Sequence, residues 1–261
     1  MIRQKKYECG NYLDIEIFNI PKGSRIVQRE KKMHESSPAQ KNLNNKKAER
    51  YFVRLVHLNF FKNDLYVDLT FENEHLPTTR DDVLKPLRNY IKSLQRYRKK
   101  QGLSPLKYIY VISNLDTNGN KVRYHVHMII NDMDRDVVES KWKYGYANTD
   151  RLKFNEVGVT GKSLYMIRQT KGDRSWGSSI NLIKPVAKVS DKKITPSIRN
   201  RMLNNPEDRE YFEKMYPGWV FTDCIIEDHN DRMTGEGLYI RMRRYDNGYI
   251  PTTKSREECS A

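Results

Sequence analysis

Cysteine is scarce in this chain. Only three of the 261 residues are cysteines, and they are Cys9, Cys224 and Cys259. An odd number of widely spaced cysteines argues against a disulfide framework and against a zinc knuckle. We therefore expect reduced, structural thiols.

Long hydrophobic stretches are also missing. No apolar run reaches the roughly 18 residues that span a bilayer. The first residues lack the apolar core of a signal peptide. We therefore expect a protein of the host cell cytosol that has no membrane partner.

Acidic residues are too few to balance the basic ones. Lys and Arg number 48 against 33 Asp and Glu, which gives a formal net charge of +15. Such an excess favours a polyanionic partner, because basic side chains neutralise phosphates and release their counterions. Nucleic acid is the first candidate, and an acidic membrane surface is the second.

Three parts of the chain differ in pattern. Residues 1–60 contain an alternating strand, a basic connector and, after Ser37 and Pro38, a long amphipathic helix. Residues 61–190 contain strands and helices that form the core domain. Residues 191–261 add helices and a β-hairpin. We expect an α+β fold with a central, mainly antiparallel sheet, helices packed chiefly on one face, and this C-terminal extension.

A basic helix is predicted between a capping box, Thr79 with Asp82, and a stop at Gly102. Pro86 indicates that the regular helix begins there or is kinked. The polar face of this helix is strongly basic, and such a face is either solvated or contacts a DNA backbone. Its candidate DNA contacts are Arg88, Lys92, Arg96 and Lys99.

Two histidines stand two positions apart in the apolar, β-branched run 122–131. If this run is a strand, alternation places His125 and His127 on one face and Val126 and Met128 on the other. The pair then offers two neutral nitrogen ligands to a divalent ion. Most such triplets are incidental, so a third ligand on the same face is needed to support a metal site.

A hairpin turn precedes the histidines. The dipeptide Asn118-Gly119 is a strong signal for a two-residue loop. With that loop, Ile112 faces His125, and Asn114 lies on the histidine face as the candidate third metal ligand. The alternative for Asn114 is that it caps the turn at the strand end, as asparagine commonly does.

A tyrosine in the segment 161–172 is the candidate nucleophile. The segment predicts a short helix that ends at a glycine. Tyrosine is a weak nucleophile at its normal pKa, so catalysis needs a metal-polarised phosphate and a nearby cation. Arg168, one turn after Tyr165, and Lys171 would supply that charge. The alternative is that Tyr165, one of 17 tyrosines, only packs at an interface.

Together these motifs resemble those of the His-hydrophobic-His endonucleases, in particular the rolling-circle replication initiators of small phages and plasmids. The resemblance extends from about Tyr7 to Gly218 and depends on the order and spacing of several motifs. The motifs are Cys9-Gly10-Asn11-Tyr12, Leu69-Thr70-Phe71, the basic helix, the hairpin with His-Val-His, Trp142 to Gly145, Tyr165, and Trp176 to Pro185.

The resemblance implies a ferredoxin-like or RRM-like palm and a mechanism. Single-stranded or supercoiled origin DNA lies across the sheet, where Arg123 would be a further contact. His125 and His127, with a third polar ligand, bind Mg²⁺ or Mn²⁺, which polarises the scissile phosphate. Tyr165 attacks and leaves a 5′-phosphotyrosine and a free 3′-OH that primes replication. Because the chain has no glycine-rich phosphate loop, a host helicase and polymerase are expected partners.

This chain departs from the family pattern in two places. Asn114 stands where these proteins usually carry glutamate, and Arg168 and Gln169 replace a lysine and an acid. Arginine keeps the charge but does not donate a proton, so an acid role would pass to Lys171 or to water. The alternatives are a DNA-binding regulator without nicking activity, a mobilisation relaxase or single-strand transposase, and an RNA-binding or RNA-processing protein.

Overall fold

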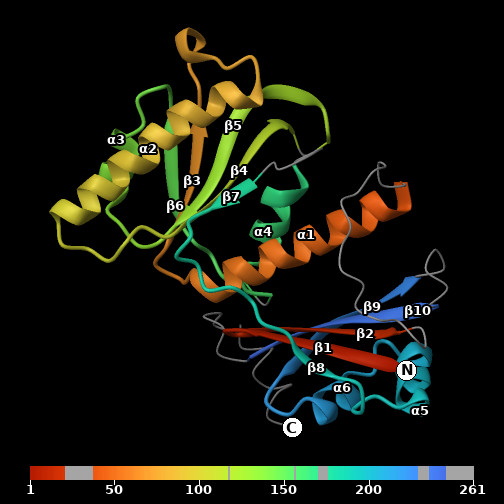
Figure 1. Ribbon diagram of the computed structural model, residues 1–261. Coiled ribbons are helices and arrows are strands. Elements are labelled where there is room, and N and C mark those ends of the chain that lie inside the picture. The colour runs from red at the N-terminus through yellow and green to blue at the C-terminus, as the bar shows by residue number, and fades with distance from the viewer. Residues whose placement is uncertain (21–37, 117, 156, 170–175, 229–234, 245–261) are drawn as a thin grey trace. The chain divides into compact units, whose positions relative to one another are not determined.

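The computed structural model describes most of the chain in six segments. They are residues 1–20, 38–116, 118–155, 157–169, 176–228 and 235–244. These residues form two five-stranded sheets and six α-helices (Figure 1). The predicted α+β class and the antiparallel pairing are confirmed, but the structure has two sheets where we expected one central sheet. The predicted basic connector lies outside the described residues.

The chain divides into two compact units. Unit 1 comprises residues 1–54, 155–158 and 185–261, and unit 2 comprises residues 55–154 and 159–184. The N-terminal and C-terminal parts, which we expected as two separate additions to a core, therefore belong to one unit.

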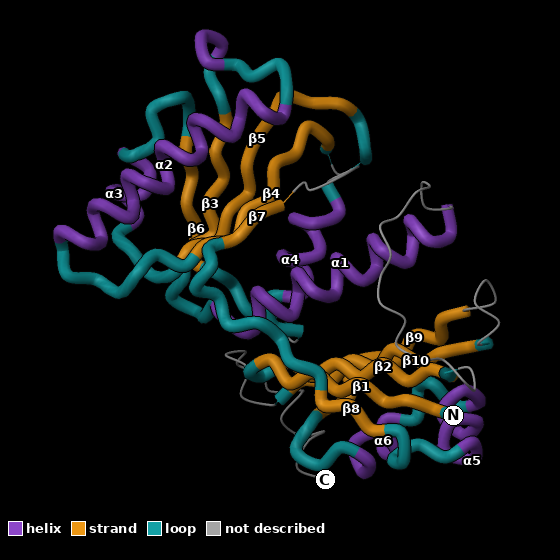
Figure 2. Tube along the Cα trace, viewed as in Figure 1, coloured by secondary structure: helices purple, strands orange, loops and turns teal. Residues whose placement is uncertain are grey.

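Unit 2 is built on an antiparallel sheet with the strand order β6-β3-β5-β4-β7 (Figure 2). Its strands are β3 (Leu65–Thr70), β4 (Tyr108–Leu115), β5 (Lys121–Ile130), β6 (Ala147–Arg151) and β7 (Trp176–Ser178). The histidine strand β5 is central and pairs with β3 on one edge and β4 on the other. Pairing on both edges holds its side chains at defined positions.

The two faces of this sheet are covered by different helices. Val126 and Ile130 of β5 are fully buried in a core that is covered by α2 (Arg80–Lys100) and α3 (Arg135–Ser140). The opposite face, which carries the histidines, is covered by α4 (Thr160–Arg168) (Figure 1). We expected helices chiefly on one face, and α4 is the departure, because it covers the face that carries the histidines.

The basic helix α2 has the boundaries that local signals predict. The Thr79 hydroxyl accepts a hydrogen bond from the Asp82 backbone N–H, and the Asp82 carboxylate accepts one from the Thr79 N–H at 2.9 Å. The helix ends just before Gly102, whose φ of 66° suits glycine. Pro86 lies inside the helix, which begins at Arg80.

The β4–β5 hairpin has a longer loop than predicted. The Asp116 carboxylate accepts hydrogen bonds from the backbone N–H and the side-chain amide of Asn120 at 2.8 and 2.9 Å, which extends the turn. A register shift follows near the end of β4, and Ser113, not Ile112, faces His125. The predicted register was therefore wrong by one residue, which exchanges the residues on the two faces.

Unit 1 is built on a second antiparallel sheet with the order β8-β1-β2-β10-β9. Its strands are β1 (Ile2–Cys9), β2 (Tyr12–Asn19), β8 (Lys188–Ser190), β9 (Val220–Asp228) and β10 (Glu236–Arg243). The predicted C-terminal hairpin is β9–β10, and β10 pairs with β2 of the N-terminal hairpin. One face packs against α5 (Pro196–Asn204) and α6 (Arg209–Met215) in a core that includes Ile15, Phe212 and Ile240.

The cysteine-glycine opening forms the turn between β1 and β2. Gly10 has a φ of 63°, which suits glycine in a tight turn. Cys9 and Cys224 are free thiols, and burial raises the pKa of each to about 12. Both are therefore unreactive structural residues at neutral pH, and Cys259 lies outside the described residues.

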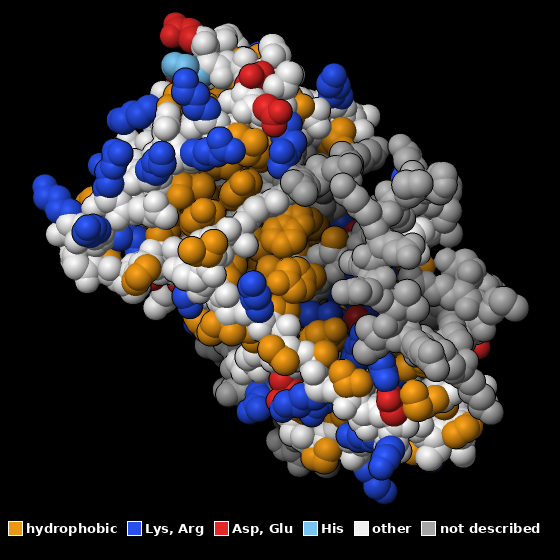
Figure 3. All heavy atoms as spheres, in the orientation of Figure 1, with side chains coloured by type: hydrophobic (Ala, Val, Ile, Leu, Met, Phe, Trp, Pro, Cys, Tyr) orange, Lys and Arg blue, Asp and Glu red, His pale blue; other side chains and the backbone are white. Residues whose placement is uncertain are grey.

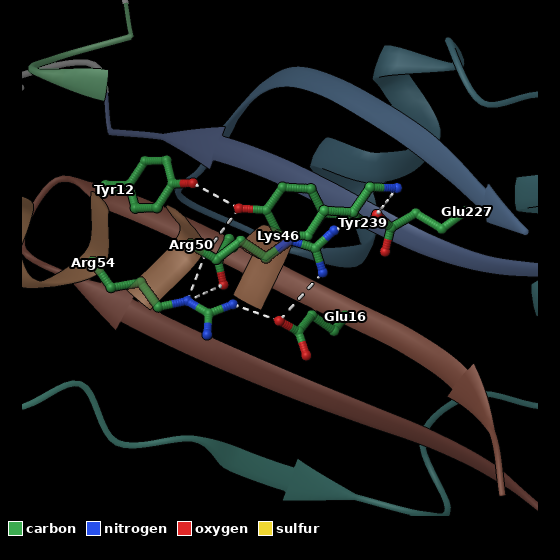
Figure 4. Close-up of polar contacts among 8 residues, drawn as sticks. Tyr12, Glu16, Lys46, Arg50, Arg54, Glu227 and Tyr239 are labelled. Atoms are coloured by element: carbon green, nitrogen blue, oxygen red, sulfur yellow. Dashed lines mark hydrogen bonds and ion pairs between the residues drawn. The ribbon is translucent and has the colours of Figure 1, made fainter. Parts of the chain in front are cut away.

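The long helix α1 (Pro38–Asn59) matches the predicted helix, and the boundary between the units falls inside it. Within unit 1, the Arg54 guanidinium binds Asp14 at 2.8 Å and Glu16 at 2.6 Å, and both carboxylates belong to β2 (Figure 4). Arg50 lies 3.5 Å from the same Glu16 carboxylate. These shielded, paired charges hold the unit 1 part of α1 on this sheet.

Candidate functional site

β3 and β5 bring a group of polar side chains to the face of the unit 2 sheet that α4 covers. Asp68 pairs with His127, and Thr70 pairs with His125. Paired residues point to the same side of a sheet, and so does Tyr66, two residues before Asp68. The two imidazole rings lie 4.7 Å apart between centroids.

His127 is oriented by two residues of β3. Its Nδ1 lies 2.5 Å from Asp68 Oδ1 and 2.7 Å from the Tyr66 hydroxyl. Burial alone would raise the pKa of Asp68, but hydrogen bonds from His127 and Tyr66 lower it, so the carboxylate is ionised. Nδ1 therefore donates to Asp68, which leaves Nε2 as the ring nitrogen that can bind a metal ion. A carboxylate in this position commonly supports a metal-binding imidazole.

His125 is oriented in the same sense by the backbone. Its Nδ1 lies 3.0 Å from the carbonyl oxygen of Arg123, which only accepts, so Nδ1 is the donor and Nε2 keeps its lone pair. The Nε2 atoms of His125 and His127 lie 3.3 and 2.9 Å from a single atom, Oε1 of Gln169. Three acceptor atoms therefore converge.

Such a donor set fits a divalent metal ion. Converging lone pairs repel one another unless a cation or a proton lies among them. Two ligands about 2.1 Å from a metal ion and about 90–110° apart are about 3.0–3.4 Å from each other, close to the separations observed. Imidazole nitrogen suits Mn²⁺ better than Mg²⁺. The described part of the chain has no cluster of three or more His, Cys, Asp or Glu side chains of this kind, because the third member here is an amide.

Gln169 follows the last residue of α4 and is only 6 % exposed. Its backbone carbonyl accepts a 2.6 Å hydrogen bond from Oγ of Ser113, the residue that faces His125. At the start of α4, Oγ1 of Thr160 lies 2.8 Å from Nε2 of His57. Both ends of α4 are thus attached within unit 2, which fixes the side chains between them.

Tyr165 projects from α4 beside the histidines. Its ring lies 5.5 Å from the His127 ring, and 41 % of the residue is exposed. Gln169 follows one turn later on the same side of the helix. Lys162, one turn earlier, places Nζ 4.0 Å over the Tyr66 ring and 5.4 Å from the Tyr165 ring. The site combines an accessible hydroxyl, three converging acceptors and an adjacent cation.

Asn114 does not occupy the predicted position. It lies at the register shift of β4, one residue beyond Ser113, whose side chain is on the histidine face. Its assignment as third ligand depended on the register that proved wrong. Gln169 instead supplies the third acceptor.

The structure describes two of the three other basic residues that were predicted at the site. Arg168 is exposed at the end of α4, and Arg123 is exposed on β5, on the histidine face by alternation. Lys171 lies outside the described residues. The cation that the structure places beside Tyr165 is Lys162, which precedes the tyrosine instead of following it.

The predicted DNA contacts of the basic helix are exposed but lie over the other face of the sheet. They are Arg88, Lys92, Arg96 and Lys99. Arg98, in contrast, is 4 % exposed and donates to the backbone carbonyls of Ser104 and Asp132 at 2.6 and 2.7 Å. The cations of α2 and the histidines therefore face opposite sides of unit 2.

Four residues of the site were not predicted from the sequence as site residues: Tyr66, Asp68, Lys162 and Gln169. Gln169 and Lys162 lie four residues after and three residues before Tyr165, a spacing that puts all three close together on a helix. Asp68 is the one charged residue in the otherwise apolar strand β3, which is a signal in itself. No local pattern, however, indicates that β3 is the neighbour of β5.

Comparisons with models of protein families, with curated proteins and with solved structures find no match. Among the helices in the described segments, none is both long and apolar enough to cross a membrane. The functional interpretation therefore depends on the geometry and chemistry of the site.

Proposed function

We propose that the protein nicks single-stranded DNA and transfers strands through Tyr165, with a divalent ion at His125, His127 and Gln169. The observation that carries this proposal is the convergence of three acceptor atoms beside an accessible tyrosine. The net charge of +15 favours a nucleic acid as the substrate. The resemblance to rolling-circle initiators suggests the setting, which is replication from an origin with host helicase and polymerase.

In this reaction, the Tyr165 oxygen attacks the phosphorus of a phosphodiester. The new oxygen–phosphorus bond forms as the bond to the 3′ oxygen breaks. The phenolic proton passes to water, and the released 3′ oxygen takes a proton from water. The products are a 5′-phosphotyrosine and a 3′-OH, and attack by a 3′-OH on the phosphotyrosine rejoins the strand. A bound Mg²⁺ or Mn²⁺ would supply Lewis-acid polarisation of a phosphate oxygen.

The surrounding residues have distinct tasks in this proposal. Asp68 and Tyr66 keep the His127 ring in one orientation and one tautomer. Lys162 offsets the negative charge that develops beside Tyr165 during attack. Arg123, on the same face, contacts the backbone of the bound strand.

The test is formation of a covalent adduct with single-stranded DNA. The full chain is incubated with Mn²⁺ and a pool of random-sequence oligonucleotides, and the products are separated on a denaturing gel. A label at the 3′ end should remain with the protein, because the 5′ phosphate of that fragment is bound to tyrosine. A label at the 5′ end should be released.

Tyr165→Phe should give no adduct. Tyr146→Phe removes a hydroxyl from another exposed tyrosine and should form the adduct as wild type does. An undiminished adduct in Tyr165→Phe would refute the assignment.

A regulator that binds DNA without nicking is the second candidate. It was favoured by Asn114 in place of an acidic ligand, and the same reason applies to Gln169, because an amide in the third position also brings no negative charge to the site. It predicts DNA binding without any adduct in the same experiment. A relaxase or transposase would form the adduct and would differ in its DNA substrate. An RNA-processing protein would bind an RNA pool in preference to DNA.

A further inference from the structure

The face of unit 2 opposite the histidines carries a pocket that the proposed reaction does not use. Its volume is about 660 Å³, within the range of pockets that hold small organic groups. Its walls come from α2, from the segment that precedes β4, from β4, and from the segment after β7. The lining residues that matter here are Lys99, Leu103, Leu106, Tyr108, Ile180 and Asn181.

The walls of the pocket are held by hydrogen bonds. The backbone N–H of Ser179 donates to the Tyr108 carbonyl at 2.9 Å, and Ser179 Oγ accepts from the Tyr108 N–H at 3.1 Å. The Asn181 amide donates to the Leu106 carbonyl at 3.2 Å. The pocket is therefore formed before a partner binds, which lowers the entropy cost of binding.

The mouth of the pocket is apolar. Ile180 is 100 % exposed and Leu103 is 44 % exposed. Single exposed apolar residues are common, but these two flank one pocket beside the Tyr108 ring. An apolar pocket mouth beside an aromatic ring suits a ligand with a flat, partly apolar ring.

A second aromatic ring continues from the pocket along β4. The rings of Tyr108 and Tyr110 stack with centroids 6.2 Å apart and planes 19° apart, and both residues are partly exposed. The Tyr110 ring lies against Gly177 of β7, where an added Cβ would be 2.6 Å from the ring. Burial raises the pKa of Tyr110, and the charges of Arg80 and Arg88 oppose that rise, so cations lie near this ring.

A stripe of cations runs along α2 beside these rings. The cations of the stripe are Arg88, Lys92 and Lys99. They are exposed together with the neutral Gln95, and the spacing of these four residues places them on one side of the helix. No acidic residue occurs between positions 85 and 100. Figure 3 shows a row of Lys and Arg side chains over α2 with hydrophobic side chains next to it. The stripe is about 16 Å long, which corresponds to about five stacked nucleotides.

We infer that this surface binds single-stranded DNA, with phosphates along Arg88, Lys92 and Lys99 and one base in the pocket against Tyr108. Cations beside aromatic rings are the arrangement by which proteins bind single strands, and a paired base would have to leave its duplex to enter. The site lies on the face opposite Tyr165 and would hold DNA that is not being cut. It depends on the proposed function only in the choice of DNA over RNA.

The test measures binding of a fluorescent oligothymidylate to the full chain by anisotropy, in EDTA. Tyr108→Ala should weaken binding about 5- to 100-fold, the range for loss of one stacked base. Tyr108→Phe keeps the ring and should bind as wild type. In Tyr108→Trp, the oligonucleotide should quench the indole fluorescence, and this readout decides the matter if Tyr108→Ala does not fold.

The cation stripe is tested by the salt dependence of the same binding. Lys92→Ala combined with Lys99→Ala should weaken binding and reduce the slope of log K against log salt by about 1.4. The matched control replaces Lys62 and Lys153, two exposed lysines elsewhere in unit 2, by alanine and should change the slope less.

Failure of the nicking proposal and failure of this site are distinguishable, because the adduct experiment needs Mn²⁺ and reports on Tyr165, whereas this binding is measured in EDTA and reports on Tyr108. Unchanged binding in a folded Tyr108→Ala would overturn the inference. Equal affinity for a duplex of the same length would also overturn it, and a preference for oligouridylate would replace it with an RNA site.

Discussion

At the scale of single residues, Gln169 would provide the third ligand of the proposed metal ion. Its Oε1 is the third acceptor beside two imidazoles. Gln169→Ala should lower Mn²⁺ affinity by at least about tenfold, because one ligand is lost. Gln169→Glu should raise affinity, because it adds a negative charge. Isothermal titration calorimetry measures both, and Asn114→Ala is the matched control with no expected effect. If Asn114→Ala lowered Mn²⁺ affinity and Gln169→Ala did not, Asn114 would be the third ligand.

Asp68 would act on the proposed metal ion through His127. With an amide at position 68, Nδ1 of His127 is free to accept a hydrogen bond, and the ring proton can then move to Nε2 and block the ligand position. Asp68→Asn should therefore lower Mn²⁺ affinity by about 10- to 100-fold. Asp150→Asn removes the same charge from the neighbouring strand β6 and should have little effect. Equal losses in both variants would point to a general charge effect.

His57 makes the stability of unit 2 depend on pH. Burial lowers its pKa from 6.5 to about 3, and its Nε2 lies 2.8 Å from Thr160 at the start of α4. Between those pH values the unfolded chain binds a proton at His57 that the folded chain does not. Its contribution is therefore complete above pH 6.5 and is lost as the pH falls toward 3.

The matching experiment is urea unfolding at pH 7.5 and pH 5. His57 should account for about 2 kcal/mol of the free energy of unfolding lost between these values, and His57→Gln should lose correspondingly less. His75→Gln, at a more exposed histidine, is the control. Identical pH dependence in wild type and His57→Gln would contradict the assignment.

At the scale of elements, the turn before β6 depends on a close approach of two backbones. Gly145 has a φ of 152°, and an added Cβ would lie 2.5 Å from the Thr70 carbonyl oxygen. The carbonyls on either side of it accept hydrogen bonds from Thr70 and Glu72. Gly145→Ala should thus destabilise unit 2 by about 2–4 kcal/mol.

Gly161 offers a matched control for that substitution. It lies in the first turn of α4, and an added Cβ would meet nothing within 4 Å. Gly161→Ala should leave the free energy of unfolding unchanged or raise it by up to about 1 kcal/mol. Denaturant melts of both variants test the pair, and equal destabilisation would show that the close approach at Gly145 is unimportant.

Elements were predictable from the sequence where their signals are local. The capping box at Thr79, the stop at Gly102 and the apolar periodicity between them indicate α2 correctly. The histidine strand was also correct in extent and in the face of each residue. The register of its hairpin was not, because the Asp116 carboxylate stabilises a longer turn than the Asn-Gly dipeptide indicates.

The candidate site was predictable only where one element carries it. His125, His127 and Tyr165 were found from their own segments, and their rings lie together. Asp68 and Gln169 joined the site through pairing of β3 with β5 and through the contact of α4 with β4. Asp68 and Gln169 are both distant in sequence from the histidines. Helical spacing places Gln169 near Tyr165, but periodicity within one segment does not indicate that either residue meets the histidines.

At the scale of the whole molecule, two sheets with separate cores share one chain. The sheet of unit 1 pairs β2, near the N-terminus, with β10, near the C-terminus. This pairing closes a very long loop, so it is entropically costly to form early and is expected to be slow. The same pairing explains an error of the sequence-based division. That division placed residues 1–60 and 191–261 in separate parts, although most of both belongs to unit 1.

Separate cores predict that unit 1 can be weakened without loss of the metal site. Phe212 is fully buried in unit 1 and stacks on Phe221 with centroids 4.8 Å apart. Phe212→Ala should cost about 3–5 kcal/mol of unit 1 stability. Leu87→Ala, in the core of unit 2, should cost about 2–5 kcal/mol there. The two variants therefore lower the free energy of unfolding by similar amounts in different cores.

Mn²⁺ binding in increasing urea distinguishes them. In Phe212→Ala, binding should persist at urea concentrations that have already unfolded unit 1, because His125, His127 and Gln169 all belong to unit 2. In Leu87→Ala, binding should be lost at lower urea than in wild type. If Phe212→Ala loses binding in the same transition that unfolds unit 1, the two cores unfold cooperatively, and the prediction is contradicted.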